Sequence, residues 1–147
     1  MRTITAIVTL NLLAGAASAQ QLKESEVPAP IVKTFHDSYK NAKAKSWEKE
    51  KNGMYEVEFN WEQAEHSVTF SSAGQILWTE VEISAKDLPQ AAGDYLNSNY
   101  PGYKTEEIKR SSMPTGDNTY KVEIKKGKEE LEIRFDGNGN FVSKEQD

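Results

Sequence analysis

Apolar and polar residues alternate along several segments of the chain, and this alternation predicts β-strands. From Tyr55 to Trp61 the odd positions are apolar and the even positions are polar, which is typical of a strand with one buried face. The segments 120–124 and 131–135 repeat the pattern. With the turns that separate them, these patterns predict eight strands: 43–51, 53–61, 64–71, 75–83, 104–111, 118–126, 129–136 and 140–145.

Two other segments follow the period of a helix. Pro28 and Pro89 stand where each helix would begin, because the first helical turn leaves its N–H groups unpaired and proline has none. Asp87 is a candidate N-cap of the second helix. Apolar residues then recur at a spacing of four in both places: Ile31, Phe35 and Tyr39, and later Ala92, Leu96 and Tyr100.

The chain reads as one unit used twice. A shift of 61 places Val27-Pro28 on Leu88-Pro89, and a shift of 65 places Tyr55–Phe59 on Tyr120–Ile124. The change of shift adds four residues to the second copy, and the segment 111–118 is the loop that holds them. The predicted fold class is therefore α+β, with repeats at 27–83 and 87–147, each a helix followed by a four-stranded antiparallel meander, and with both helices on one face of the sheet.

The other face of such a sheet is expected to meet water. Its side chains should come from the polar positions of the alternating strands. In the first copy these are Glu56, Glu58, Asn60, Ser67 and Thr69, and in the second they are Lys121, Glu123, Lys125, Glu132 and Arg134. If the two meanders join side by side, they form one broad surface that suits a partner.

The first nineteen residues read as a secretory signal peptide. Arg2 precedes an apolar run from Ile4 to Ala17, and Ala17-Ser18-Ala19 predicts cleavage before Gln20. The run is too short for a membrane span, and the chain has no Cys for a lipid anchor, a disulfide or a thiolate metal site. We therefore expect a periplasmic or secreted protein that forms one domain, 20–147, without a membrane span after cleavage.

The charge and the composition argue against two classes of protein, nucleic-acid-binding proteins and disordered chains. The formal net charge of −5 gives no electrostatic basis for binding nucleic acid. Although the mean hydropathy is −0.72, aromatic residues make up 10 % of the chain, which indicates a folded domain rather than a disordered one.

The strand series GMYEVEFNW…HSVTFSSAGQIL and NTYKVEIKKGKEELEIRFDGNGNFV resembles the PepSY-like proteins of bacterial envelopes. Those proteins are grouped with the fold of the β-lactamase inhibitor protein, and the resemblance spans residues 27–145. It implies a periplasmic or secreted protein of largely uncharacterised role, and it brings no catalytic residues with it. Inhibition of a β-lactamase does not follow from the fold alone.

Three features carry candidate chemistry. Asp136, Asn138 and Asn140 have the spacing of calcium ligands, but Phe141 stands where a calcium loop needs glycine, and we expect a hairpin turn without metal or cofactor. His66 lies in phase with core residues, which indicates a structural histidine. The carboxylate pairs, such as Glu56 and Glu58, are expected to stay solvated, so the sequence does not indicate an enzyme.

The tryptophans suggest where a partner could bind. Trp47 matches an apolar residue of the second copy and is expected in the core, whereas Trp61 matches Lys126 and Trp78 matches Ser143. Exposed tryptophans are favoured anchors at binding surfaces. Trp61 could instead cap the first core, and Trp78 could pack where the copies meet.

The sequence thus favours a binding or inhibitory module that holds a protein or peptide partner. The alternative is a small-ligand carrier or sensor of the envelope. The candidate partner-binding residues are Trp78, Trp61, Glu56, Glu58 and Thr69.

Overall fold

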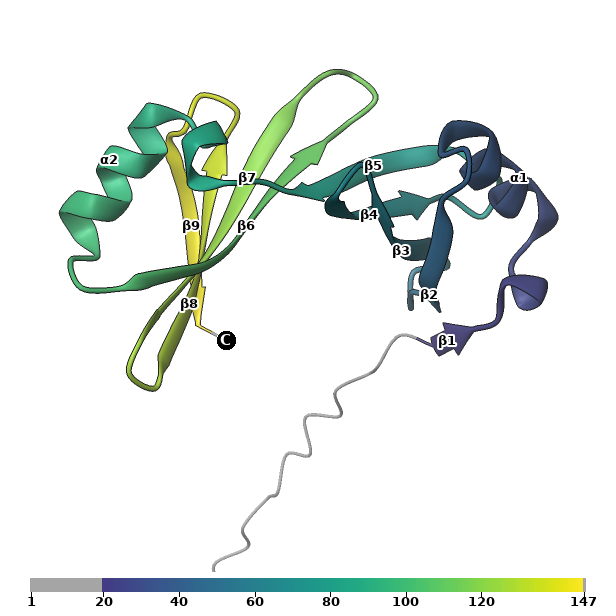
Figure 1. Ribbon diagram of the computed structural model, residues 1–147, viewed down its shortest axis with the longest axis horizontal. Helices are drawn as coiled ribbons and strands as arrows, with labels where there is room; N and C mark the ends of the chain where they lie inside the picture. The colour runs from purple at the N-terminus through teal and green to yellow at the C-terminus, as the bar shows by residue number, and fades with distance from the viewer. Residues whose placement is uncertain (1–19, 147) are drawn as a thin grey trace, which may run out of the picture.

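A single antiparallel sheet of nine strands, with two helices, makes up the protein (Figure 1). The structure is a computed structural model that describes residues 20–146. The strands lie in the sheet in chain order: β1 (Gln20–Leu22), β2 (Lys43–Lys49), β3 (Tyr55–Trp61), β4 (Ala64–Phe70), β5 (Ile76–Glu82), β6 (Lys104–Ser112), β7 (Asn118–Lys126), β8 (Glu129–Asp136) and β9 (Phe141–Gln146). The helices are α1 (Ala29–Ser38) and α2 (Gln90–Asn99), and short 3₁₀ turns precede them, η1 (Glu24–Glu26) and η2 (Ala85–Asp87).

The eight predicted strands are present, with small differences at their ends, but the prediction missed β1. This strand has only three residues, and it is held by pairing with β2, where Leu22 faces Trp47. Its sequence, Gln-Gln-Leu, has no alternation of its own, so no local pattern could have shown it. The predicted signal peptide, residues 1–19, lies outside the described residues.

Both helices begin directly after a proline, as predicted. Pro28 and Pro89 are the N-cap residues, and their carbonyl groups accept hydrogen bonds from Ile31 and Ala92 at 2.9 and 3.0 Å. The prediction that Asp87 is an N-cap was wrong. Its carboxylate instead accepts the hydroxyl of Ser84 at 2.6 Å across the turn η2.

A helix followed by four antiparallel strands occurs twice in the chain, and local irregularities recur at matched positions. The pairing of β2 with β3 shifts between Ala44 and Ser46, and that of β6 with β7 shifts between Thr105 and Glu107, 61 residues later. The pairings of β4 with β5 and of β8 with β9 shift at sites that are 65 residues apart. The shifts of 61 and 65 residues found in the sequence therefore equal the distances along the chain between matching irregularities in strand pairing.

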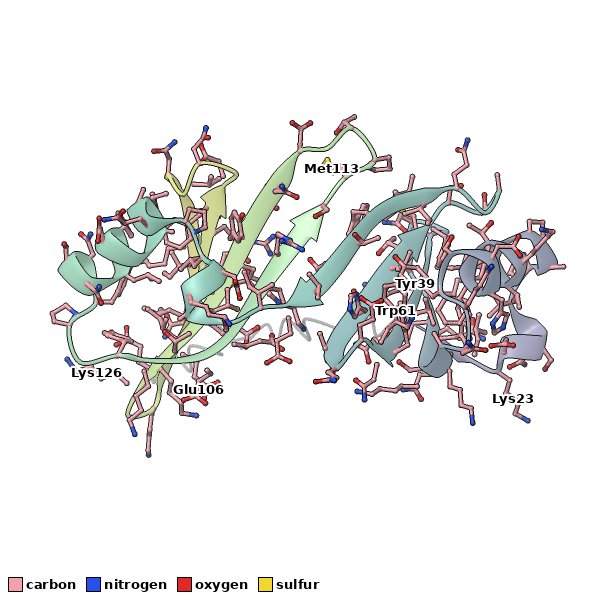
Figure 2. All side chains as sticks on the ribbon, turned by 45° about the horizontal axis from the view of Figure 1, so that its top comes forward. Lys23, Tyr39, Trp61, Glu106, Met113 and Lys126 are labelled. Atoms are coloured by element: carbon pink, nitrogen blue, oxygen red, sulfur yellow. The ribbon has the colours of Figure 1, made fainter. Side chains whose placement is uncertain are left out.

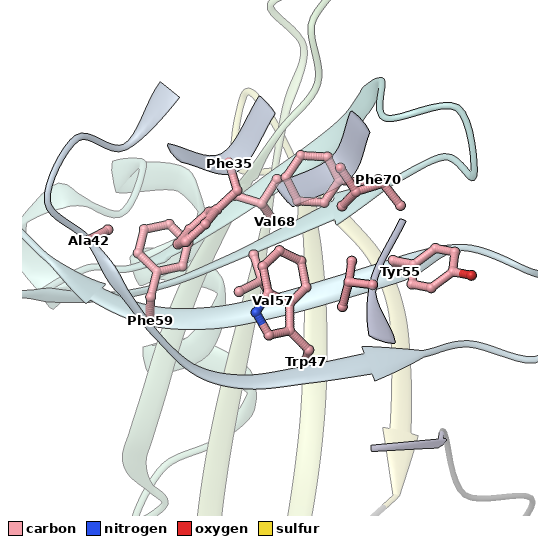
Figure 3. Packing of buried hydrophobic residues seen from close by; sticks show 10 residues of the cluster. Phe35, Ala42, Trp47, Tyr55, Val57, Phe59, Val68 and Phe70 are labelled. Atoms are coloured by element: carbon pink, nitrogen blue, oxygen red, sulfur yellow. The ribbon is translucent and has the colours of Figure 1, made fainter. Parts of the chain in front are cut away.

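Each helix covers its own hydrophobic core. In the first core, Phe35 of α1 packs edge-on against Trp47 and Phe59, with ring centroids 5.4 and 5.0 Å apart (Figure 3). Trp47 is 3 % exposed, as predicted. The second core is more aliphatic, and Ala92 is the buried residue that α2 contributes. Its other buried members are Ile108, Val122, Ile124, Leu131, Ile133 and Phe135.

The two helices lie on the same face of the sheet, near its two ends (Figure 1). Successive register pairs join the two cores along one row of that face: Phe59, His66, Val81, Arg110, Tyr120 and Phe135. We call the opposite surface the open face, because none of the described helices covers it. The strands change direction strongly between β5 and β6, as expected for a twisted sheet (Figure 1).

Candidate partner-binding surface

The open face is built by the side chains that alternate with the core residues along each strand. The registers place one set of such residues on every strand from β2 to β9. In the first copy the set includes Ser46, Glu48, Glu56, Glu58, Asn60, Glu65, Ser67, Thr69, Trp78, Glu80 and Glu82. In the second copy it includes Glu107, Lys109, Ser111, Thr119, Lys121, Glu123, Lys125, Glu130, Glu132, Arg134, Ser143 and Glu145.

Four of the five predicted binding residues come together on this face. Glu56 faces Thr69 on the next strand, and Thr69 faces Trp78 on the strand after that. Glu58 lies two residues along β3 from Glu56 and is exposed. The side chain of Trp78 is half-buried. An aromatic side chain beside carboxylates on an exposed sheet face offers both apolar contact and charge to a partner.

Thr69 is only 2 % exposed, so the expectation that it meets water was wrong. It is the shortest member of its row, flanked on the neighbouring strands by the longer side chains of Glu56 and Trp78. Thr69 therefore supports the surface from below, and a partner would reach the residues beside it first.

Three carboxylates of the first copy lie close together, and their environments differ. Burial raises the pKa of Glu56, the Ser67 hydroxyl opposes this rise, and the negative charge of Glu80 adds to it. The expectation that Glu56 stays fully solvated was therefore wrong. Glu58 accepts the hydroxyl of Ser46 at 3.1 Å, and Glu80 accepts that of Ser111 at 2.5 Å.

Trp61, the fifth predicted residue, lies on the helix-covered face and apart from the other four. Its ring packs edge-on against Tyr39 of the segment that follows α1, with centroids 5.2 Å apart (Figure 2). It also contacts the ring of His66 at 5.8 Å. Trp61 is partly buried against the first core, which is the capping position that the sequence left open as an alternative.

His66 is a half-buried member of the same aromatic cluster. Its ring stacks on Phe59 at 5.6 Å, and desolvation lowers its pKa. A small pocket of about 30 Å³ is lined by His66, Ser67 and Glu56 among others. Because His66 pairs with core residues while Ser67 and Glu56 belong to the open face, this pocket does not assemble a hydroxyl and an imidazole for nucleophilic chemistry.

The segment of Asp136, Asn138 and Asn140 folds as a tight hairpin turn. Asp136 Oδ1 accepts the backbone N–H groups of Asn138 and Asn140, each at 2.9 Å, and its Oδ2 accepts the Asn140 side-chain amide at 3.0 Å. These hydrogen bonds lower the pKa of Asp136. Within residues 20–146 no three His, Cys, Asp or Glu side chains are grouped closely enough to hold a metal ion.

Sequence reasoning missed how the charges of the second copy are ordered in rows across the strands. One row consists of Glu107, Glu123, Glu132 and Glu145, and the next contains Lys109, Lys121 and Arg134. Like charges directly opposite one another are destabilising, and ion pairs along each strand offset this. These pairs are Lys109–Glu107 at 3.2 Å, Lys121–Glu123 at 3.2 Å and Arg134–Glu132 at 2.5 Å.

Glu132 is covered by the cations around it and is only 8 % exposed, although the sequence pattern placed it in water. Lys121 of the neighbouring strand also reaches it, at 3.6 Å. The rows could have been found in the sequence, because alternation along each strand and the tight turn after Lys126 together fix the register of β7 with β8.

The fold defines a class of protein: an open antiparallel sheet with two helices on one face and an ordered, charged surface on the other. The sequence model of the family described as "Putative beta-lactamase-inhibitor-like, PepSY-like" matches residues 16–78 and again residues 55–143. The chain belongs to this PepSY-like family.

Solved structures share the fold at low sequence identity. A DUF2874 family protein from Bacteroides uniformis has 16 % identity and a TM-score of 0.72, over 81 % of this chain and 88 % of its own. A protein from Bacteroides eggerthii, described as "putative periplasmic", has 12 % identity and a TM-score of 0.74, over 82 % and 88 %. A BLIP-like protein from Bacteroides fragilis has 20 % identity and a TM-score of 0.64, over 81 % and 85 %.

No functionally curated protein matches the chain by sequence. Among residues 20–146, neither helix is long and apolar enough to cross a membrane.

Proposed function

We propose that this protein is an exported, non-enzymatic module that binds, or inhibits, a protein or peptide partner through its open face. The observation that carries the proposal is the uncovered face itself, on which Trp78 lies half-buried in the same cross-strand row as Glu56, with Thr69 between them and Glu58 two residues along β3 from Glu56. Half-buried tryptophans beside polar groups are frequent energetic centres of protein interfaces. Membership of a family described as inhibitor-like supports the same class of function.

The pockets favour a macromolecular partner over the alternative, a small-ligand carrier or sensor. Pockets that enclose a small ligand usually measure about 300–1,000 Å³. The pockets that open-face side chains help to line are smaller, at about 30, 120, 180 and 280 Å³. A larger hollow of about 540 Å³ lies beside α1, but most of its lining residues are exposed, including Glu24, Ser25 and Lys33, so it is shallow.

The proposal includes the organisation of the chain. Residues 1–19 act as a signal peptide, and residues 20–147 form one PepSY-like domain made of two copies, 27–83 and 87–147. The recurring shifts in strand pairing and the two overlapping matches to the family support the duplication. The periplasmic description of the Bacteroides eggerthii protein supports a periplasmic or secreted location.

Affinity capture with the mature chain tests the proposal. Residues 20–147 are immobilised and exposed to envelope extract of the native host, and the affinity of each retained protein is then measured after its purification. Trp78→Ala should lower the affinity for a true partner by about thirtyfold, as expected for an interface anchor. Glu58→Lys should also weaken it, whereas the matched change Asp94→Lys, on the exposed side of α2, should not.

Equal affinity of the wild type, Trp78→Ala and Glu58→Lys for every retained protein would refute a role of the open face. Retention of no protein at all by the wild type would refute the binding function.

A further inference from the structure

A pocket of about 120 Å³ opens on the open face beside the boundary between the two copies. Two rows of side chains meet there. Glu80, Ser111 and Thr119 face one another across β5, β6 and β7, and the neighbouring row brings Lys121 opposite Arg134. Val142, which is 59 % exposed, adds an apolar wall. We call this site the seam pocket.

The cations of the seam pocket are held in place from one side. Lys121 pairs with Glu123 at 3.2 Å, and Arg134 pairs with Glu132 through Nη2 at 2.5 Å. Both carboxylates belong to the row on the far side of the cations from Ser111 and Thr119. An arginine has five N–H donors in a planar fork, so an ion pair with one carboxylate does not occupy all of these donors. The Arg134 side chain is 50 % exposed and can accept a second anion.

The matched positions of the first copy show that the sheet does not require these cations. The offset of 65 places Lys121 on Glu56, and Arg134 on Thr69. The backbone has the same shift in strand pairing beside Thr69 and beside Arg134. A negative and a neutral side chain therefore serve at equivalent places in the same fold, and the positive pair is a property of the second copy alone.

The opposite wall limits which anion fits. Glu80 contributes a carboxylate whose Oε1 accepts the hydroxyl of Ser111 at 2.5 Å in a partly buried position. This negative charge disfavours phosphate and other multiply charged anions, because like charges at short distance repel strongly when solvent is partly excluded. A single carboxylate on a short aliphatic stem satisfies the cations and places its methylene groups against Val142.

From this arrangement we infer that the seam pocket binds the carboxylate of an aspartate or glutamate side chain of the protein partner, with Lys121 and Arg134 as its ligands. This inference rests on the proposed function, since it names a chemical feature of the same partner. It also divides the open face, because the first copy presents Trp78 and carboxylates whereas the second copy presents a receptor for one.

The first test uses two small probes and the folded mature chain in a buffer of low ionic strength. N-acetyl-glutamate amide carries one side-chain carboxylate and no other charge, and N-acetyl-glutamine amide differs from it by that group alone. In a titration followed by ¹H–¹⁵N NMR, the glutamate probe should shift the signals of Thr119, Lys121 and Arg134 saturably. The dissociation constant should be on the order of millimolar, and the glutamine probe should cause little change.

Variants show whether the pocket causes the binding. Arg134→Gln and Lys121→Gln should each lower the affinity for the glutamate probe by about tenfold, because each removes a charge-assisted hydrogen bond. Lys125→Gln is the matched control, since Lys125 lies on the same strand and face as Lys121 but does not line the pocket. Shifts spread evenly over all basic residues, or equal responses to the two probes, would overturn the inference.

The second test applies the same variants to the protein retained by the open face. Arg134→Gln should lower its affinity, and Lys125→Gln should not. If the partner binds Arg134→Gln as tightly as wild type while Trp78→Ala weakens it, the assignment of the seam pocket is wrong and the proposed function stands. Failure of the proposed function gives a different result: the wild type retains no protein, or Trp78→Ala and Glu58→Lys bind every retained protein as tightly as the wild type does.

Discussion

Ser111 donates a hydrogen bond of 2.5 Å to Glu80 across the boundary between the two copies. Only four register pairs join β5 to β6, and Glu80 with Ser111 is one of them. The buried side chains of the two cores form separate clusters, so this bond lies where little hydrophobic contact joins the two copies.

We predict that Ser111→Ala lowers the free energy of unfolding by about 1–2 kcal/mol, because it leaves a partly buried carboxylate without its donor. Chemical denaturation followed by circular dichroism gives this value. Ser111→Thr retains a hydroxyl and suits a strand, so it should stay close to wild type. An alanine variant as stable as wild type would show that water replaces the serine without loss.

A second prediction concerns the pH dependence that Glu56 contributes. Burial raises the pKa of Glu56 above its ordinary value of 4.5, so the folded chain binds this proton more tightly than the unfolded chain does. The ionised side chain therefore opposes folding at neutral pH, and this opposition disappears as the pH falls to 4.5 and below. Glu56→Gln should raise the melting temperature at pH 7, and the gain should vanish near pH 4.

Titration of the Glu56 side-chain carboxyl by NMR measures the pKa directly. Ser67→Ala should raise the pKa further, because the Ser67 hydroxyl favours the ionised form. A Glu56 pKa at or below 4.5 in the wild type would contradict the prediction.

The sequence predicts the elements of this fold well because each has a local pattern. Alternation over 55–61 gives β3, and Pro28 and Pro89 mark the helix starts because only the backbone of a first turn tolerates them. The parts that were missed depend on partners distant in sequence. The strand β1 exists only through β2, and Thr69 is buried by neighbours that the cross-strand register selects.

The residues of the candidate site fall into the same two groups, those that a local pattern predicts and those that depend on partners distant in sequence. Alternation placed Glu56 and Glu58 on one face, because a strand fixes the side to which each residue points. The registers of the structure add Trp78 to that face. Alternation could not decide that Trp61 packs against Tyr39, since that contact depends on where α1 ends above the sheet. Nor could it give the burial of Glu56, which depends on the side chains that the neighbouring strands β2 and β4 place around it.

A third prediction distinguishes a turn from a calcium site at Asp136. Its carboxylate holds the turn through the N–H groups of Asn138 and Asn140, and these bonds lower its pKa. The ionised form therefore stabilises the fold above the unfolded-state pKa near 3.8, and this support is lost as the pH falls through the lower pKa of the folded state. Asp136→Ala should lower the melting temperature at pH 7, and the difference from wild type should fade in strong acid.

Calcium gives an independent readout of the same turn. Millimolar calcium should leave the melting temperature of the wild type unchanged, because the Asp136 oxygens are already occupied by donors of the turn. A calcium-dependent rise of several degrees that is absent in Asp136→Ala would establish a metal site instead.

The last prediction concerns the glycine that lets the β8–β9 turn approach α2. Gly139 has a φ of +86°, and a Cβ built there would lie 2.8 Å from Pro89 Cβ and 2.9 Å from the backbone N of Ala92. Alanine at this position therefore meets two penalties, a left-handed backbone and a collision with the start of the helix. Gly139→Ala should lower the free energy of unfolding by about 2–4 kcal/mol.

Gly116 separates the two effects, because it has a φ of +93° and no atom within 4 Å of a built Cβ. Gly116→Ala should therefore cost only about 1 kcal/mol. Equal losses in the two variants, measured by urea denaturation, would show that the turn moves away from α2 easily and that the glycine serves backbone geometry alone.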